Sequence, residues 1–130
     1  MGSPESVAPP DGAPALLLVD DDDDLSRVLT RALDRAGYTI HRARTGNEAL
    51  ALIPHVGRLD AAVVDLVLPG AGGLEVVRSV RGTFPRCRIV AITGLAEPAL
   101  ERAFHAAGAD AFLAKPVELP QLLEAVAARA

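Results

Sequence analysis

The sequence predicts an α/β domain in which five parallel strands alternate with five helices. Short apolar runs recur along the chain, and most of them are apolar on both faces. Strands of this kind suit a parallel sheet covered by helices on both sides, because neither face of the sheet then meets water. The segments between the runs repeat their apolar residues at helical spacing. The chain has 130 residues, 50% of them hydrophobic, which suits one domain with one continuous core.

Five segments are expected to be strands, and they differ in how apolar they are. The first, third and fourth are continuous apolar runs, the fifth is shorter, and the second is weaker because polar residues interrupt it. The expected strands cover residues 15–19, 39–43, 61–64, 89–92 and 111–114.

Capping residues bound the first two expected helices. Apolar residues repeat at helical spacing over residues 25–36, and Gly37 is expected to end that helix. Asp23 or Asp24 is expected to cap its start, where the helix dipole favours a negative charge. A capping box, Thr-Gly-Asn-Glu at residues 45–48, opens the second helix.

Glycine and proline mark the other three helices. A third helix is expected over residues 74–80, with Gly82 as its stop. Pro98 occupies the first turn of a fourth helix, which ends before Gly108. A fifth helix is expected from about Pro120 to the C-terminus.

The alternation of strands and helices also predicts how the sheet is connected. Each βα repeat makes a right-handed crossover onto one parallel sheet. At this length the doubly wound, flavodoxin-like strand order 2-1-3-4-5 is expected. In such a sheet the ligand site lies beyond the carboxyl ends of the strands, at the point where the winding direction reverses. The first and third strands flank that point, so the residues that end the strands are the candidates for function.

Composition and charge exclude several classes of protein. The net charge is −4 and no basic run occurs, which argues against sequence-independent binding of nucleic acid. Cys87 is the only cysteine, so no intrachain disulfide can form. No apolar stretch approaches the roughly 20 residues that cross a bilayer, and the N-terminus lacks the parts of a signal peptide. A cytoplasmic protein without membrane or direct nucleic-acid contact is expected.

Residues 1–14 are expected to form a disordered, proline-rich leader, and residues 15–130 the folded domain. The leader contains four prolines and few large apolar side chains. Such a segment cannot bury enough surface to offset the entropy lost on ordering. A spacer without a function of its own accounts for this segment as well as a functional segment does.

Polar side chains end four of the expected strands. Five consecutive aspartates, residues 20–24, follow the first strand, and Asp65 follows the third. Thr93 follows the fourth strand and Lys115 the fifth. Because the carboxyl ends of parallel strands share one edge of a sheet, these carboxylates, a hydroxyl and an ammonium are expected around one crevice.

The crowding of carboxylates points to a bound cation. Carboxylates repel one another unless positive charge joins them. Lys115 supplies one charge, and a divalent metal would supply the rest. An all-oxygen ligand set suits Mg²⁺ better than zinc. The three histidines, His41, His55 and His105, fall on different elements and have no ligand spacing.

Asp65 is a candidate nucleophile, because a carboxylate can attack phosphorus and give an acyl phosphate. Phosphoryl transfer needs mainly positioning and charge neutralisation around the phosphoryl oxygens. Mg²⁺ and Lys115 would neutralise them, and the Thr93 hydroxyl would donate a hydrogen bond. Gly94, which has no side chain, leaves room for the phosphoryl group.

Taken in order, these motifs resemble the receiver domain of response regulators over residues 15–130. Each motif alone is weak, but the whole set at strand ends is specific. The matching segments are Leu-Leu-Val-Asp-Asp at 17–21, Val-Asp-Leu-Val-Leu-Pro-Gly at 64–70 with Gly73, Ala-Ile-Thr-Gly at 91–94, Gly-Ala-Asp at 108–110 and Lys-Pro at 115–116.

The resemblance implies a role for each residue at the strand ends. It implies that Asp65 takes a phosphoryl group from a phosphohistidine, on a sensor histidine kinase or a phosphotransfer protein. It implies that Mg²⁺ is held by Asp20, Asp21, Asp65 and the backbone carbonyl of Val67. It also implies that the chain assists its own phosphorylation and dephosphorylation but turns over no free substrate, so it is not an enzyme in the usual sense.

The resemblance further implies a switch on the fourth and fifth strands. Thr93 and Lys115 would contact the phosphoryl group, and a cis peptide before Pro116 would aim Lys115 into the site. Phe112 would turn inward as Thr93 moves toward the phosphoryl group, a bistable packing biased by a new charge. Plain core packing of Phe112 is the alternative.

The expected output surface is formed by the fourth helix, the fifth strand and the fifth helix. A downstream protein would bind this surface. The chain would be either a stand-alone receiver or a receiver cut from a longer chain, and a homodimer is also possible. An ordinary solvated face is the alternative. The candidate exposed groups are Glu101, Arg102, His105, Glu118, Gln121 and Glu124.

Two departures from the family pattern stand out. Gly72 occupies a position that is often acidic or Asn in receivers, so the loop over residues 69–73 is expected to be pliable. The last three aspartates of the run exceed what the motif needs. Helix capping explains one of them, and contact of Asp22 with a metal-bound water is the sharper alternative.

Three other functions are compatible with parts of the sequence. Asp20-x-Asp22 after an apolar strand also resembles the nucleophile motif of haloacid dehalogenase-type phosphatases. Those enzymes need a further acidic pair after the lysine, which this sequence lacks, and that function would leave Asp65 without a role. The hypothesis of a flavin-binding protein is supported by the fold class alone. A non-phosphorylated pseudo-receiver, used as an interaction module, is the alternative that stays open.

Overall fold

The computed structural model describes residues 12–68, 72–94 and 97–127. The leader expected at residues 1–14 lies mostly outside these residues, and so does most of the loop expected to be pliable. The first strand begins at Ala15, where the expected domain begins.

Five parallel strands form one sheet in the order β2-β1-β3-β4-β5, so the predicted strand order is confirmed. Each strand is parallel to its neighbours. The strands are β1 (Ala15–Val19), β2 (Thr39–Ala43), β3 (Ala61–Asp65), β4 (Arg88–Thr93) and β5 (Ala111–Ala114).

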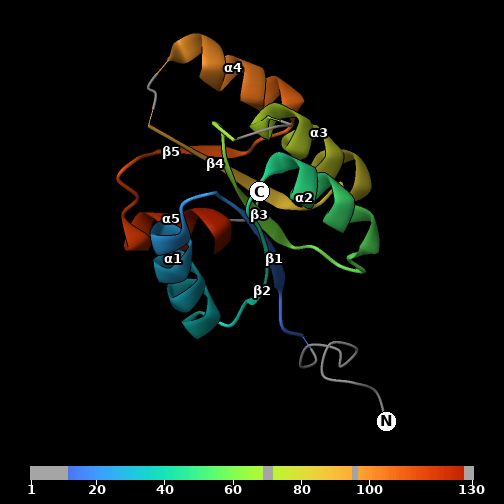
Figure 1. The fold of residues 1–130 in the computed structure, drawn as a ribbon, viewed down its shortest axis with the longest axis vertical. Helices are drawn as coiled ribbons and strands as arrows, with labels where there is room; N and C mark the ends of the chain where they lie inside the picture. The colour runs from blue at the N-terminus through green and yellow to red at the C-terminus, as the bar shows by residue number, and fades with distance from the viewer. Residues whose placement is uncertain (1–11, 69–71, 95–96, 128–130) are drawn as a thin grey trace.

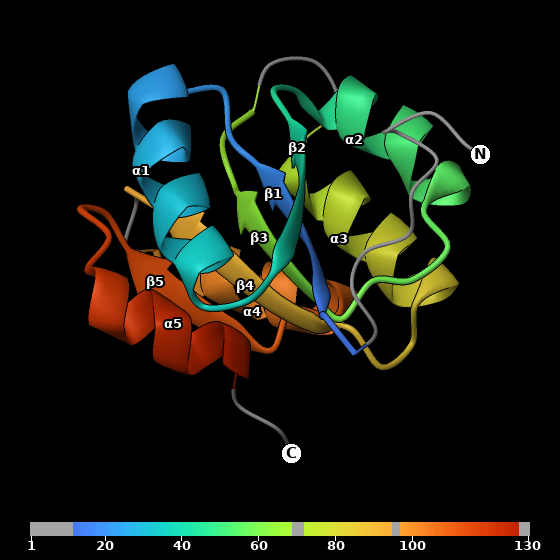
Figure 2. The same cartoon turned by 90° about the horizontal axis from the view of Figure 1, so that it is seen from below.

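Helices cover both faces of the sheet (Figures 1 and 2). Two of them, α1 and α5, lie on one face, and α2, α3 and α4 lie on the other. The helical elements are α1 (Asp23–Arg35), α2 (Gly46–Leu52), the 3₁₀ turn η2 (Ile53–His55), α3 (Gly73–Thr83), α4 (Pro98–Ala107) and α5 (Leu119–Ala127).

The two layers of the core divide the side chains of each central strand. In β1, Leu17 and Val19 face α2, α3 and α4, whereas Leu16 and Leu18 face α1 and α5. All four of these side chains are fully buried. The alternation follows from the two-residue period of a strand, and it explains why the run is apolar throughout.

Most predicted helix boundaries are confirmed. Gly37 follows α1 with a φ of +101°, a conformation in which glycine meets no steric penalty. The Thr45 side chain accepts a hydrogen bond from the Glu48 N–H at 3.0 Å, as in the predicted capping box. Pro98 opens α4, and Gly108 caps its C-terminal end.

Two predicted helix ends are wrong. Gly82 does not stop α3, which continues to Thr83, because a glycine in an exposed last turn costs only about 1 kcal/mol and does not remove a hydrogen bond. The cap of α1 is Asp22 rather than Asp23 or Asp24: its side chain accepts a hydrogen bond from the Leu25 N–H at 3.1 Å.

None of the helices in the described part of the chain is both long enough and apolar enough to span a membrane.

Candidate functional site

The carboxyl ends of β1, β3, β4 and β5 bring together the residues predicted from the strand ends. Asp20 follows β1, Asp65 is the last residue of β3, and Thr93 is the last residue of β4. Lys115 follows β5. The three strand-end residues Asp20, Asp65 and Thr93 are all buried, each with 5% exposure or less.

Asp65 is held at both carboxylate oxygens. Its Oδ2 accepts a hydrogen bond from the Lys115 ammonium at 2.8 Å, and its Oδ1 accepts one from the Val67 N–H at 3.0 Å. Burial acts to lower the pKa of Lys115, but the hydrogen bond and the charge of Asp65, helped by Asp20 and Asp22, outweigh burial and raise it. Lys115 is therefore a permanent positive charge beside Asp65.

Asp20 carries a buried oxygen that this protein does not satisfy. Its Oδ1 accepts a hydrogen bond from the Asp22 N–H at 2.7 Å. Within the described part of the chain, its Oδ2 has no hydrogen-bond partner, since the Lys115 ammonium is 3.9 Å away. Burial raises the pKa of Asp20; the Asp22 N–H and Lys115 oppose that rise, and the charges of Asp65 and Asp21 add to it.

A divalent cation fits this arrangement. Asp20, Asp21 and Asp65 can each offer an oxygen so that the three atoms lie within 4.8 Å of one another. Two of these side chains are buried and Asp21 is exposed, which leaves a solvent side for water ligands. A hard, oxygen-liganded cation that keeps several waters, such as Mg²⁺, suits this donor set. Such a cation would also satisfy the orphaned Oδ2 of Asp20.

The other aspartates of the run have structural partners. Asp22 caps α1, as described above. Asp23 forms ion pairs with Arg42 at 3.0 Å and Arg44 at 2.9 Å, and the hydrogen bond from Arg42 leads the causes that lower the pKa of Asp23. Asp24 pairs with Arg27 at 3.1 Å across one turn of the helix. Sequence reasoning missed Arg42 and Arg44, because their contacts depend on how β2 lies beside α1.

The residues expected to contact the phosphoryl group sit on the two neighbouring strands. The Lys115 N–H donates to the Thr93 carbonyl at 2.7 Å, so the ends of β4 and β5 are tied together. The peptide bond between Lys115 and Pro116 is cis. Gly94 is exposed, and a Cβ built on it would meet no atom within 4 Å. The space beside the Gly94 Cα is therefore open.

Gly73 is required by a close approach of helix and strand. It is the first residue of α3, and a Cβ built on it would lie 2.7 Å from the Asp65 carbonyl oxygen and 3.0 Å from the Leu66 Cα. Any side chain here would push α3 away from the end of β3. Gly73 therefore allows α3 to begin directly against the backbone of Asp65, a close approach that its place in the sequence motif did not reveal.

Phe112 packs under α4. It pairs with Ala91 across β4 and β5, and it is partly buried in the core layer beneath α4. Its ring lies edge-on to Phe104, with 6.0 Å between ring centroids, and tilted toward His105 at 5.1 Å. The six residues proposed for the output surface are all exposed.

The model of the response regulator receiver domain matches residues 16–127. The chain belongs to this family. It is a receiver domain of a two-component system, and receiver domains are signalling modules.

Curated relatives of the receiver domain include whole signalling proteins. It is 37% identical to the sensor kinase CckA of Brucella abortus over 88% of this chain and 12% of that protein. It is 40% identical to the response regulator MprA of Mycobacterium tuberculosis over 83% of this chain and 46% of that protein. The chain spans less than half the length of these relatives.

Solved receiver structures share the fold. A response regulator from Burkholderia pseudomallei, crystallised with a phosphorylated aspartic acid, a calcium ion and citrate, has a TM-score of 0.80 at 32% identity, over 87% of this chain and 66% of that one. A CheY-like receiver domain from Methanospirillum hungatei JF-1 also scores 0.80, at 31% identity, over 87% of this chain and 90% of that one.

Proposed function

We propose that this receiver domain is a Mg²⁺-dependent phosphoacceptor that takes a phosphoryl group on Asp65 from a phosphohistidine. The donor is a sensor histidine kinase or a phosphotransfer protein. The observation that carries the proposal is the buried Asp20 Oδ2, which has no hydrogen-bond partner in the described part of the chain and lies beside the Asp65–Lys115 pair. A site built only for stability would not leave a buried carboxylate oxygen unpaired.

Four groups would hold Mg²⁺: the carboxylates of Asp20, Asp21 and Asp65, and the backbone carbonyl of Val67. The bound ion would neutralise charge on the phosphoryl oxygens during transfer. The relative from Burkholderia pseudomallei, whose structure has a phosphorylated aspartic acid and a calcium ion, supports an acidic metal site next to the acceptor.

The chain's own residues position the reacting groups. A carboxylate oxygen of Asp65 attacks phosphorus as the bond from phosphorus to the donor imidazole nitrogen breaks, and that nitrogen keeps the electron pair. The Lys115 ammonium, now on Asp65 Oδ2 at 2.8 Å, moves its hydrogen bond to a phosphoryl oxygen. The Thr93 hydroxyl donates to another, and the open space beside Gly94 admits the group. Water later hydrolyses the acyl phosphate, which releases inorganic phosphate and restores the Asp65 carboxylate.

Phosphorylation is proposed to reach the output surface through Thr93 and Phe112. Movement of Thr93 toward the phosphoryl group would free space under β4, and Phe112 would turn inward from its contacts with Phe104 and His105. A downstream protein would then read the α4, β5 and α5 face in the cytoplasm, with a homodimer as one form of the complex. The contact between Phe112 and α4 supports this route, because the same ring touches both the sheet and the output helix.

The test of the acceptor is the intact mass of the protein after incubation with Mg²⁺ and acetyl phosphate. Wild type is expected to gain one phosphoryl group, and Asp65→Asn none. Asp24→Asn is the matched control, because Asp24 pairs only with the exposed Arg27 among the contacts that the structure gives it, and it should be phosphorylated like wild type.

The alternative outcome separates the two receiver types. If neither acetyl phosphate nor a phosphorylated histidine kinase modifies wild type, the phosphoacceptor proposal fails. The chain is then a pseudo-receiver that acts as an interaction module. A partner whose binding is insensitive to Asp65→Asn would point the same way.

The switch is tested by hydrogen exchange with and without phosphorylation. Phosphorylation is expected to change exchange over residues 94–114, with the largest change near Phe112, whereas β1 should be unaffected. Full phosphorylation without any change in that segment would remove the switch and leave Phe112 as core packing.

A further inference from the structure

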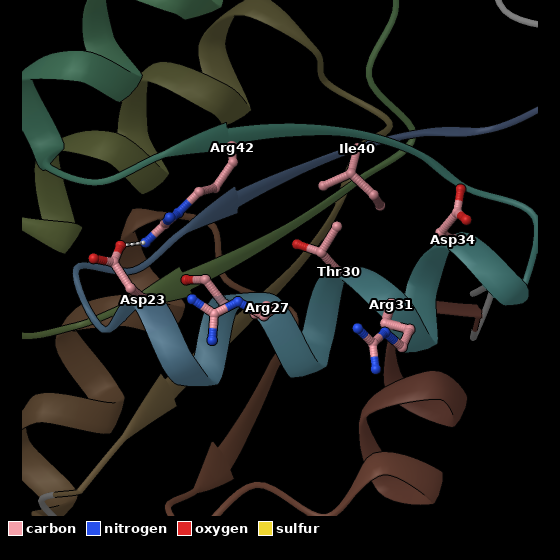
Figure 3. Close-up of a pocket in the computed structure, with 8 residues that line it drawn as sticks. Asp23, Arg27, Thr30, Arg31, Asp34, Ile40 and Arg42 are labelled. Atoms are coloured by element: carbon pink, nitrogen blue, oxygen red, sulfur yellow. Dashed lines mark ion pairs between the residues drawn. The ribbon is translucent and has the colours of Figure 1, made fainter.

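Arg42 joins the edge strand β2 to the turn that carries the candidate metal ligands. Figure 3 shows its side chain reaching from β2 to Asp23 at the start of α1, at one end of a surface groove between the two elements. The same guanidinium nitrogen, Nη2, donates to the backbone carbonyl of Asp20 at 2.9 Å. Arg42 therefore contacts the turn at two points, one on each side of Asp21.

Both backbone polar groups of Asp20 are bound by residues of β2. The Asp20 N–H donates to the Ala43 carbonyl at 3.2 Å, and the Asp20 carbonyl accepts from Arg42. The Ser26 hydroxyl adds a longer contact of 3.5 Å to the same carbonyl. Because that carbonyl belongs to the peptide that joins Asp20 to Asp21, its direction sets how both carboxylates point.

We infer that Arg42 is a positioning residue for the Mg²⁺ site, acting through the Asp20 carbonyl. The inference rests on the proposed function, since it concerns the same site. Arg42 does not touch any of the proposed metal-binding oxygens; it holds the backbone from which two of them project. Partners of this outer kind commonly contribute 10–100-fold to metal affinity.

The geometry of Arg42 favours positioning over simple stabilisation. Its Nε is buried, and the described part of the chain offers it no hydrogen-bond partner. A buried, unpaired N–H is a cost to stability. The side chain is thus held where one nitrogen reaches Asp20 and Asp23, although another nitrogen stays unsatisfied.

Arg44 provides a matched comparison. It also pairs with Asp23, through Nη1 at 2.9 Å and Nη2 at 3.1 Å, but no contact between it and Asp20 occurs among the described residues. Arg42→Met and Arg44→Met therefore each remove one positive charge and one partner of Asp23. Only Arg42→Met also removes the hydrogen bond to the Asp20 carbonyl.

Charge and geometry predict opposite results for these variants. Removal of a nearby positive charge favours a cation, so charge alone predicts that both variants bind Mg²⁺ slightly more tightly than wild type. Loss of the carbonyl contact predicts weaker binding in Arg42→Met alone. For Arg42→Met, loss of the carbonyl contact is expected to weaken Mg²⁺ binding about tenfold and to outweigh the effect of charge. Asp23 already neutralises much of the Arg42 charge, so the effect of charge is small.

The experiment is calorimetric titration of each unphosphorylated protein with MgCl₂, followed by acetyl phosphate labelling over a range of Mg²⁺ concentrations. Arg42→Met is expected to raise the Mg²⁺ dissociation constant about tenfold, and Arg44→Met to change it less than twofold. The Mg²⁺ concentration for half-maximal labelling should rise in step, while the labelling rate at saturating Mg²⁺ stays within about twofold of wild type. A merely structural role would lower the saturated rate or the folded fraction instead.

Arg42→Lys is the second variant, in case Arg42→Met does not fold. The lysine ammonium keeps the charge beside Asp23 but ends one bond short of the Nη2 position. It is expected to weaken Mg²⁺ binding in the same direction and by less than Arg42→Met.

The outcomes separate this inference from the proposed function. Equal Mg²⁺ affinity in wild type, Arg42→Met and Arg42→Lys overturns the role of Arg42 and leaves the phosphoacceptor untouched. Equal weakening in Arg42→Met and Arg44→Met also overturns it, because loss of the Asp23 pairing would then be the cause. Wild type that neither binds Mg²⁺ nor accepts a phosphoryl group overturns both.

Discussion

Two clusters of charge in this receiver domain contrast sharply in how well they are satisfied. At the carboxyl edge of the sheet, three carboxylates face one ammonium, and a buried oxygen of Asp20 has no hydrogen-bond partner among the described residues. Near the opposite ends of β4 and β5, the Arg81 guanidinium makes five hydrogen bonds. The first cluster is therefore incomplete among the described residues, because one buried oxygen lacks a partner, and the second is complete in itself.

The Arg81 cluster is an example of charged groups whose hydrogen bonds stabilise the fold. Its guanidinium donates to the carbonyls of Pro85, Cys87 and Gly108, and it pairs with Asp110 at 2.8 Å. The Asp110 carboxylate also accepts the Ile89 N–H at 2.8 Å. One side chain from α3 thus ties together the start of β4 and the loop between α4 and β5. Each guanidinium N–H of Arg81 has an acceptor, and this distinguishes the Arg81 cluster from the site.

The largest expected effect is on the complete cluster. Arg81→Met should lower the free energy of unfolding by about 3 kcal/mol, because it removes all five hydrogen bonds that the Arg81 guanidinium donates. Urea denaturation without Mg²⁺ measures this loss. Mg²⁺ affinity of the folded fraction should be unchanged, and a loss of both together would mean that the two clusters are coupled.

The next test makes the same chemical change in each cluster. Asp20→Asn should raise the free energy of unfolding of the Mg²⁺-free protein by about 1 kcal/mol, because a neutral amide relieves a buried, crowded carboxylate. Asp110→Asn should lower it by about 1 kcal/mol, because it removes the ion pair with Arg81. Thermal unfolding of both variants without metal gives the comparison. Two shifts of the same sign would break the distinction between the clusters.

The smallest expected effect is a dependence on pH. Burial raises the pKa of Asp20, so the folded state holds its proton more tightly than the unfolded chain does. The stability linked to this group is complete below the ordinary pKa of an aspartic acid, and it is lost as pH rises through the raised pKa. Stability of the Mg²⁺-free wild type should therefore fall relative to Asp20→Asn over that interval. Parallel stability curves for the two proteins would remove Asp20 as the source.

Sequence reasoning located the incomplete cluster better than the complete one. The strand order and the strand-end residues Asp20, Asp65, Thr93 and Lys115 followed from the alternation of strands and helices, since topology alone brings those ends to one edge. Whether these residues perform the proposed chemistry stays a prediction. What topology could establish was their proximity.

The contacts that sequence reasoning missed depend on long side chains and close packing. Arg81 reaches residues far along the chain, and Arg42 reaches Asp20 from the neighbouring strand β2. Gly73 is needed because α3 begins against the Asp65 carbonyl. The cap at Asp22, rather than Asp23, follows from a turn closed by the Asp20 side chain. Apart from the cap, which is a local turn, these contacts join residues far apart in the chain or depend on how closely two elements pack, so local spacing and helix propensity do not predict them.

The length of the run of five aspartates also sets the rotation of α1 relative to the sheet. The first two aspartates continue directly from β1, and Leu29 and Leu33, a few residues later, must both point into the core. Deleting any one aspartate would leave a run of the same letters, yet it would turn the rest of α1 by about 100° relative to the sheet. The two leucines would then face away from their layer of the core. The length of the run is thus as strictly constrained as its charge, although composition reveals only the charge.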